Sequence, residues 1–239
     1  MVLTIPIKPV IWLIRALGHQ ELANDLSLKI VRILFHSLKA ASGVDLQLRG
    51  IENLPDRDDD GVLFVGNHCS YFDIILSACA FKTCTGYIGK KELGRIPLLN
   101  TWMLTIGCIF LDREDPRDGI RMVQAACENI SHKNSMVIFP EGTRNRHEKD
   151  SLVGTFHQGS LRIAQKCGCK VIPMAITGSA DIFEKHFPIV KAGKVIIEFA
   201  KPIDTASMDR GEQKHLAQIT HDIILDMRKE HIKELPLSD

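Results

Sequence analysis

The sequence predicts an α/β fold in which helices flank a mainly parallel, mixed sheet. The chain has 239 residues, 45% of them hydrophobic, which is enough for one α/β domain with its own core. After Gly43, short runs of β-forming residues alternate with helical patterns, as in parallel sheets that helices cover on both faces. The first 43 residues carry only helical patterns. We therefore predict a separate segment over residues 1–43 and an α/β domain over residues 44–239.

The amino-terminal segment is predicted to form two amphipathic helices that associate with a membrane. Its start, MVLTIPIKPVIWLIRAL, is apolar, but Lys8 and Arg15 interrupt it, and the uninterrupted run is shorter than the roughly 20 residues of a spanning helix. Residues 1–43 contain five basic and two acidic side chains, a net charge of +3, which suits the surface of an anionic bilayer. The alternative is that both helices pack on the sheet.

Seven later runs are predicted as strands because they are short, rich in β-branched and aromatic residues and bounded by turn residues. Helical patterns lie between several of them, over residues 72–81, 116–132 and 158–167, and a long helical pattern covers residues 212–235. Substrate sites in such sheets lie in the loops after the carboxyl ends of strands. The predicted strands are VDLQLRG (44–50), GVLFVG (61–66), CTGYIG (84–89), GCIFLD (107–112), SMVIFP (135–140), KVIPMAI (170–176) and KVIIEFA (194–200).

Charge and cysteine content argue against some classes of function. The net charge is +1 and the sequence pI is near 7.7, so no broad basic face for nucleic acid is expected. The seven cysteines are scattered, and CGC at residues 167–169 is neither a Cys-x-x-Cys redox motif nor a zinc knuckle. We therefore expect reduced thiols and a folded part in the cytosol.

One histidine and one aspartate stand where catalysis is expected. In GNHCSYFD, residues 66–73, His68 falls in a turn from strand to helix and Asp73 in the first helical turn, where the backbone can bring them together. An aspartate bonded to one ring nitrogen fixes the tautomer and leaves the other nitrogen free to take a proton. The alternative is that Asp73 only caps the helix. His221 and Asp226 share this spacing within a helical pattern, where five residues turn by about 140°, so we predict two solvated positions.

Cationic side chains follow three other strands. FPEGTR, residues 139–144, combines Gly142, which permits close approach of a ligand, with Arg144, whose planar fork suits phosphate. Lys90 and Lys91 follow a second strand and Arg113 a third. Together these strand ends supply one base and several cations, which fits a pocket that binds an anion and deprotonates a hydroxyl. The alternative for each cation is a solvated surface charge.

Four blocks of this sequence resemble a known family. NHCSYFD, KKELGRIP…GCIFLDR, FPEGTR and VIPMAI are similar, in order and spacing, to the blocks of the glycerolipid acyltransferase family. Within that family the sequence most resembles the 1-acyl-sn-glycerol-3-phosphate acyltransferase branch. The blocks run from about residue 66 to residue 176. This agreement is far more specific than a lone His/Asp spacing.

The resemblance implies transfer of a fatty acyl group from acyl-CoA or acyl-carrier protein to the 2-hydroxyl of lysophosphatidic acid, which gives phosphatidic acid. It implies His68 as general base, Asp73 as its orienting partner and Pro173 in a block on the acyl-donor side. It further implies membrane association, at the cytoplasmic face of the inner or cell membrane, with no metal and no cofactor besides the donor. The predicted substrate-binding residues are Lys90, Lys91, Arg113, Glu141, Gly142, Thr143 and Arg144.

Two departures from the family pattern keep other acceptors open. FHQG, residues 156–159, has His157 where the family often has lysine, and the preceding loop is long and charged. An acyltransferase acting on glycerol-3-phosphate, a lysophospholipid or an amino-acid lipid would keep the His/Asp pair and change these loops. A thioesterase or a non-catalytic lipid-binding protein are further alternatives. No Gly-x-Ser-x-Gly motif of a serine hydrolase is present.

Overall fold

A seven-stranded sheet forms the centre of the protein in a computed structural model that describes residues 7–97, 99–148 and 150–237. The strand order is β1-β7-β6-β2-β5-β3-β4. Neighbouring strands pair in parallel except β6 and β7, which pair antiparallel. The predicted mainly parallel, mixed sheet is confirmed. Five strands fall within one predicted run each, and β3 and β6 extend one residue beyond theirs. The strands are β1 Asp45–Arg49, β2 Leu63–Gly66, β3 Thr85–Lys90, β4 Ile109–Leu111, β5 Ser135–Ile138, β6 Val171–Thr177 and β7 Lys194–Phe199.

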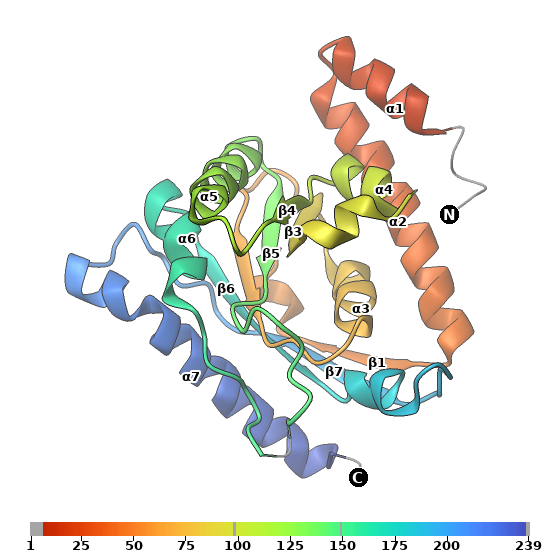
Figure 1. Cartoon of the computed structure of the whole chain (residues 1–239), viewed down its shortest axis with the longest axis vertical. Coiled ribbons are helices and arrows are strands. Elements are labelled where there is room, and N and C mark those ends of the chain that lie inside the picture. Colours follow the sequence, from red (N-terminus) through yellow and green to blue (C-terminus); the bar gives the residue numbers. More distant parts are fainter. Residues whose placement is uncertain (1–6, 98, 149, 238–239) are drawn as a thin grey trace.

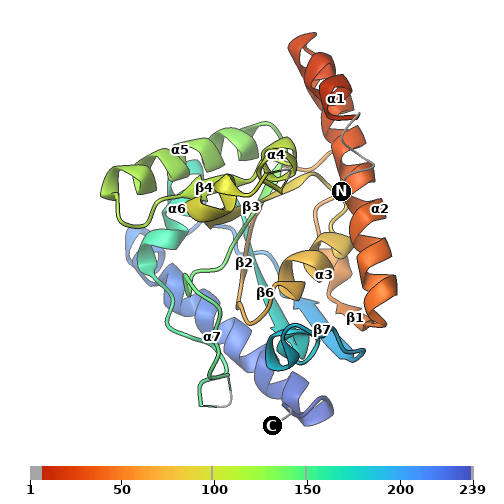
Figure 2. The same cartoon turned by 45° about the vertical axis from the view of Figure 1, so that its right-hand side comes forward.

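Helices cover both faces of the sheet (Figures 1 and 2). The α-helices are α1 Ile7–Ala16, α2 Gln20–Ser42, α3 Phe72–Ala80, α4 Leu99–Thr105, α5 Pro116–Ser131, α6 Arg162–Cys167 and α7 Arg210–Glu234. Short 3-10 helices are η2 Ile51–Asn53, η3 Lys91–Arg95, η4 Gln158–Leu161, η5 Ser179–Asp181 and η6 Glu184–His186. Among the α-helices of the described residues, α4 is the one without a predicted counterpart; its seven residues stand alone, whereas the six of α6 extend the helical pattern of η4.

Two hydrophobic cores lie on opposite faces of the sheet. Phe64 packs with residues of α2 and α3, whereas its neighbours Leu63 and Val65 pack with residues of α5, α6 and α7. Successive strand residues point to opposite faces, so a strand covered on both sides needs an unbroken apolar run. β2 and β6 are buried along their whole length for this reason.

The first two helices pack on each other and on the rest of the chain. Ile11 of α1, Ala23 and Ile30 of α2 and Trp102 of α4 share a buried cluster, and an Arg15 guanidinium N–H donates to the Thr105 carbonyl at 2.7 Å. Several apolar side chains still face outward, including Val10, Trp12, Leu13, Leu17, Leu22 and Ile33. Among the described residues, no helix combines the length and apolar character needed to cross a membrane. Residues 1–6 of the predicted segment lie outside the described residues.

The second His/Asp spacing lies on α7, as predicted, but only one of its residues is solvated. Asp226 is exposed and pairs with Lys229 at 2.8 Å. His221 is half-buried, because its ring meets the edge of Phe156 at 5.2 Å, and it bonds to Asp222 at 3.0 Å. The prediction for His221 is wrong because α7 packs along the loop that carries Phe156.

Candidate active site

The turn between β2 and α3 is fixed at its first residue. Asn67 is fully buried; its side-chain N–H donates to the Ile176 carbonyl at 2.9 Å and its Oδ1 accepts from the Ile176 N–H at 2.8 Å. These two bonds join the end of β2 to β6 where the ladder between them ends. The residues that follow therefore leave the sheet from a rigid origin.

His68 and Asp73 are in contact, as their spacing predicts. Their Nδ1 and Oδ2 atoms lie 2.8 Å apart, and the same oxygen accepts the backbone N–H groups of Cys69 at 2.7 Å and Ser70 at 2.8 Å. Asp73 is fully buried at the amino end of α3, where the helix dipole favours an anion. With its proton on Nδ1, the His68 ring donates to Asp73 and keeps Nε2 as a proton acceptor. Asp73 is therefore not only a helix cap: α3 begins after Tyr71 without a side-chain capping bond, and the carboxylate bonds to the preceding turn and to His68.

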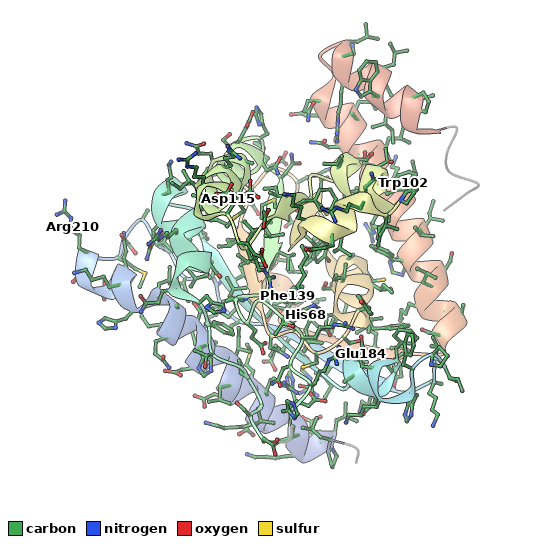
Figure 3. The ribbon with its side chains drawn as sticks, viewed as in Figure 1. His68, Trp102, Asp115, Phe139, Glu184 and Arg210 are labelled. Atoms are coloured by element: carbon green, nitrogen blue, oxygen red, sulfur yellow. The ribbon has the colours of Figure 1, made fainter. Side chains whose placement is uncertain are left out.

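The loop after β5 holds the other side of His68. Phe139 stacks on the imidazole with ring centroids 4.3 Å apart and an interplanar angle of 14° (Figure 3). Glu141 accepts the His68 backbone N–H at 2.8 Å and the Gly154 N–H at 3.1 Å. A side-chain carbon at Gly154 would lie 2.5 Å from the Glu141 carboxylate, so a larger residue there would displace that carboxylate. Burial raises the pKa of Glu141. Glu141, predicted to bind substrate, thus uses its carboxylate to hold the His68 turn and the Gly154 backbone together.

A large pocket opens beside this loop, between α5, α6 and the ends of β4 and β5. It has a volume of about 750 Å³ and an apolar wall that includes Ile88, Leu111, Ile120, Met122, Val123 and Ile138. Arg113, His157, Arg162 and Lys166 also line it, so it joins an apolar wall to basic groups. We call it the α5/α6 pocket.

Arg113 and Gly142 meet in the α5/α6 pocket. Gly142 has a φ of +74°, and a side-chain carbon there would lie 3.3 Å from Nη1 of Arg113 and 3.4 Å from the His157 ring. Glycine is therefore required for its conformation and for the close packing of both side chains. Burial lowers the pKa of Arg113, although the guanidinium stays charged in ordinary conditions.

Arg144 points into a different pocket, of about 470 Å³. Its guanidinium pairs with Glu184 at 2.9 Å and lies 3.9 Å above the Tyr71 ring. Figure 3 shows Glu184 and Asp115, which line the two pockets, on opposite sides of His68. We call this second space the Arg144 pocket. The structure therefore does not gather all predicted phosphate-binding residues in one pocket, because Arg113 and Gly142 line the α5/α6 pocket and Arg144 lines the other.

The remaining predicted residues lie outside both sets of pocket-lining residues. Lys90 and Lys91 are exposed, and Lys91 pairs with Asp112 at 2.8 Å. Thr143 is exposed on the loop. Pro173 is buried within β6, where its carbonyl accepts the Ala200 N–H at 2.9 Å. Its surroundings are those of a sheet residue, which gives no support to a donor-side contact.

One buried ion pair near the site was not foreseen from the sequence. Arg228 of α7 is fully buried and donates to Glu148 at 2.8 Å and to the Leu152 carbonyl. Its Nη1 also lies 3.7 Å from the Cys69 sulfur. These residues are remote in sequence, so no local spacing indicates the pair. Across the described ranges, no group of three or more His, Cys, Asp or Glu side chains is arranged to hold a metal ion.

Comparison with known proteins finds acyltransferases, both among family models and among individual proteins. A family model described as acyltransferase matches residues 45–177. The chain is 26% identical to the 1-acyl-sn-glycerol-3-phosphate acyltransferase of Saccharomyces cerevisiae over 215 residues, 90% of this chain and 69% of that protein. It is 29% identical to the protein of the same name from Borreliella burgdorferi over 184 residues, 77% of this chain and 72% of that protein.

A solved structure shares the fold. The crystal structure of the 1-acyl-sn-glycerophosphate acyltransferase of Thermotoga maritima superimposes with a TM-score of 0.75 and 24% identity, covering 100% of this chain and 98% of that one. This likeness extends to the whole chain, including α1 and α2. The α/β architecture is thus one that a known protein adopts.

Proposed function

Since the chain belongs to the acyltransferase family, we propose that it transfers a fatty acyl group from a thioester donor to the 2-hydroxyl of 1-acyl-glycerol-3-phosphate, producing phosphatidic acid. The observation that carries this proposal is the His68–Asp73 contact of 2.8 Å beside a pocket that is both apolar and cationic. Relatives named 1-acyl-sn-glycerol-3-phosphate acyltransferases support the choice of acceptor.

The chemistry follows from the neutral Nε2 of His68. It removes the proton of the acceptor hydroxyl as that oxygen attacks the thioester carbonyl, and Asp73 stabilises the imidazolium that forms. The carbonyl oxygen then becomes an oxyanion, and its collapse expels the donor thiolate, which takes up the proton from His68. Base, phosphate ligands and donor site are all side chains and backbone, so the reaction as proposed needs no metal or cofactor besides the acyl donor.

Arg113 is the principal ligand of the acceptor phosphate. Arg113 is exposed and lies beside Gly142, so its guanidinium fork is open to a phosphate, with Thr143 next to Gly142 on the loop. Arg144 also attracts the acceptor phosphate, from the other side of the loop, but more weakly because its guanidinium already pairs with Glu184. The apolar wall of the α5/α6 pocket suits a fatty acyl chain, and Arg162 and Lys166 suit the phosphates of CoA or of the carrier-protein prosthetic group.

A membrane supplies the lipid substrate. The outward-facing apolar side chains of α1 and α2, such as Trp12 and Ile33, together with the basic residues of both helices suit the interface of an anionic bilayer. The cytoplasmic face is the side on which thioester donors are available. We therefore place the enzyme at the cytoplasmic surface of a membrane.

The test is a mass-spectrometric assay of purified protein with anionic vesicles, palmitoyl-CoA and 1-acyl-glycerol-3-phosphate. Wild type is expected to form phosphatidic acid, and His68→Ala is expected to lower kcat by roughly 10²-fold or more with little change in folding. Full activity of His68→Ala would contradict the mechanism. Free fatty acid without phosphatidic acid would indicate a thioesterase, and turnover only with another lysophospholipid or glycerol-3-phosphate would change the acceptor.

A further inference from the structure

We propose that the segment of residues 185–194, KHFPIVKAGK, is a second membrane-contacting surface, separate in sequence from α1 and α2. Its middle exposes three apolar side chains in four residues: Phe187 is 73% exposed, Ile189 63% and Val190 45%. Apolar groups that are this exposed and this close together mark a surface that another apolar phase covers. We call residues 185–194 the apolar loop.

Charge identifies an anionic bilayer as the occupant. The apolar loop carries Lys191 and Lys194, and no acidic residue occurs between residues 185 and 197. Lys185 also belongs to the loop, but it lies 3.7 Å from Glu148 and pairs with Asp181, so it is not counted as a membrane-binding cation. The nearest carboxylates on the preceding turn are already neutralised, because Asp181 pairs with Lys185 at 2.8 Å and Glu184 with Arg144 at 2.9 Å. An apolar tip followed by two cations is a pattern that inserts at the headgroup boundary of an anionic membrane.

The fold places the apolar loop beside the amino-terminal helices. Ala192 lies against Gly43, which ends α2, since a side-chain carbon at Gly43 would be 2.9 Å from the Ala192 Cβ. The Gly193 carbonyl also accepts the Asp45 N–H at 2.9 Å. Figure 1 shows this cyan turn at the lower right, beside the end of α2. One bilayer surface can therefore touch both the α1/α2 side and the apolar loop.

The apolar loop also forms the outer wall of the Arg144 pocket. Phe187 lines that pocket together with Phe183, Tyr71 and Cys69, the residue after His68. Ring centroids are 5.4 Å apart for Phe187 and Phe183 and 6.5 Å apart for Phe183 and Tyr71. An aromatic path thus leads from the exposed tip to the catalytic turn. We infer that a single-chain lipid enters from the bilayer along this path, and this second half of the inference rests on the proposed function.

The bilayer contact is tested by vesicle sedimentation of the full chain. Ile189→Ser/Val190→Ser is expected to lower partitioning onto phosphatidylcholine/phosphatidylglycerol vesicles by about 10-fold, because two apolar side chains no longer insert. Lys191→Gln is expected to lower it by about 5-fold on these vesicles and not on pure phosphatidylcholine. Matched controls are Ile51→Ser, an exposed residue beyond the opposite end of β1, and Lys170→Gln, an exposed residue at the start of β6. Both controls should bind like wild type.

Unchanged partitioning of the Ile189/Val190 variant would overturn the inference. So would a dimer that this variant dissociates while vesicle binding persists, because the occupant would then be a second copy of the chain.

The inference that lipid enters along the aromatic path is tested with two forms of the acceptor. The Ile189/Val190 variant is expected to turn over a short-chain lysophosphatidic acid, dissolved below its critical micelle concentration, like wild type. It is expected to show a raised apparent KM for the long-chain acceptor held in vesicles. Equal KM values for the vesicle substrate would refute entry at the apolar loop. Failure of wild type on both acceptors would reject the proposed function, while the sedimentation result would still decide the bilayer contact.

Discussion

A single carboxylate oxygen of Asp73 accepts three hydrogen bonds. The strength of all three bonds therefore depends on the negative charge of that carboxylate. Two of the donors are backbone groups of Cys69 and Ser70, and the third is the His68 ring. Such charge-assisted bonds are about twice as strong as bonds between neutral groups. A neutral amide in the same place keeps the shape of the turn but no longer stabilises an imidazolium.

Asp73→Asn is therefore expected to lower kcat by at least about 10²-fold while the melting temperature changes only slightly. The measurement is steady-state kinetics together with thermal unfolding. Asp226→Asn is the matched control, because it belongs to the same His/Asp spacing but is exposed on α7. Wild-type turnover by Asp73→Asn would show that His68 does not act as a base oriented by Asp73.

Arg113, which follows β4, and Arg144, in the loop after β5, differ in what they already bind. Arg113→Ala is expected to raise the acceptor KM by roughly 10-fold or more and to leave the donor KM unchanged, because a charge-assisted contact to the phosphate is lost. Arg144→Ala is expected to raise the acceptor KM by less, since Glu184 already neutralises part of its charge. Arg210→Ala, an exposed change at the start of α7, serves as control.

Initial-rate kinetics with each substrate varied in turn separate these cases. Equal effects of Arg144→Ala on both substrates would mean that Arg144 only holds the loop. A larger effect at Arg144 than at Arg113 would move the phosphate to the Arg144 pocket.

At the scale of elements, α7 is joined to the loop after β5 by one buried ion pair. Arg228 reaches from the helix to Glu148 and to the Leu152 carbonyl, and Glu148 is itself buried. Lys185 of η6 also approaches Glu148, at 3.7 Å. Three segments that are remote in sequence therefore meet at one carboxylate, which lines the Arg144 pocket.

Arg228→Met is expected to destabilise the fold by about 3–5 kcal/mol, because Glu148 is left buried without its main partner. Arg228→Met/Glu148→Leu should recover much of that loss, since no unpaired charge remains. The measurement is the free energy of unfolding in urea, and Lys229→Met, an exposed neighbour, should stay within about 0.5 kcal/mol of wild type. A double variant no more stable than Arg228→Met would contradict the charge-pair explanation.

At the scale of the whole molecule, a buried histidine links stability to pH. Burial lowers the pKa of His231 below the usual 6.5, against the opposing effect of Glu198, whose carboxylate lies 2.7 Å from Nε2. At pH values between the lowered pKa of the folded protein and 6.5, the unfolded chain therefore binds more protons at His231 than the folded chain does. Stability from this source is present above pH 6.5 and is lost as the pH falls through that window.

His231→Gln keeps a hydrogen-bonding side chain beside Thr177 and removes the titration. The loss in free energy of unfolding between pH 7 and pH 5 is expected to be smaller for this variant than for wild type. Denaturant unfolding at the two pH values measures the difference. An equal loss in both proteins would show that His231 does not couple folding to pH.

The parts that local sequence determines were predictable. The seven strands and the turn that joins His68 to Asp73 depend on residues a few positions apart, whose alternation or spacing already fixes which side chains share a face. The family resemblance added the order of the four sequence blocks to these local patterns. The acyltransferase family model matches residues 45–177, which contain those blocks. The predictions of an acyltransferase and of His68 as its base thus rest on short-range patterns.

Packing alone decided the rest. Gly142 and Arg144 are two residues apart, yet they line different pockets, because the left-handed conformation at Gly142 and the Glu184 contact turn the chain between them. The pairing of Glu148 with Arg228, 80 residues away, and the placing of the apolar loop beside α2 have no local signature. Such contacts arise only when the sheet brings remote segments together, so the sequence determined the strands and the His/Asp turn, and the tertiary structure determined how the pockets are arranged around that turn.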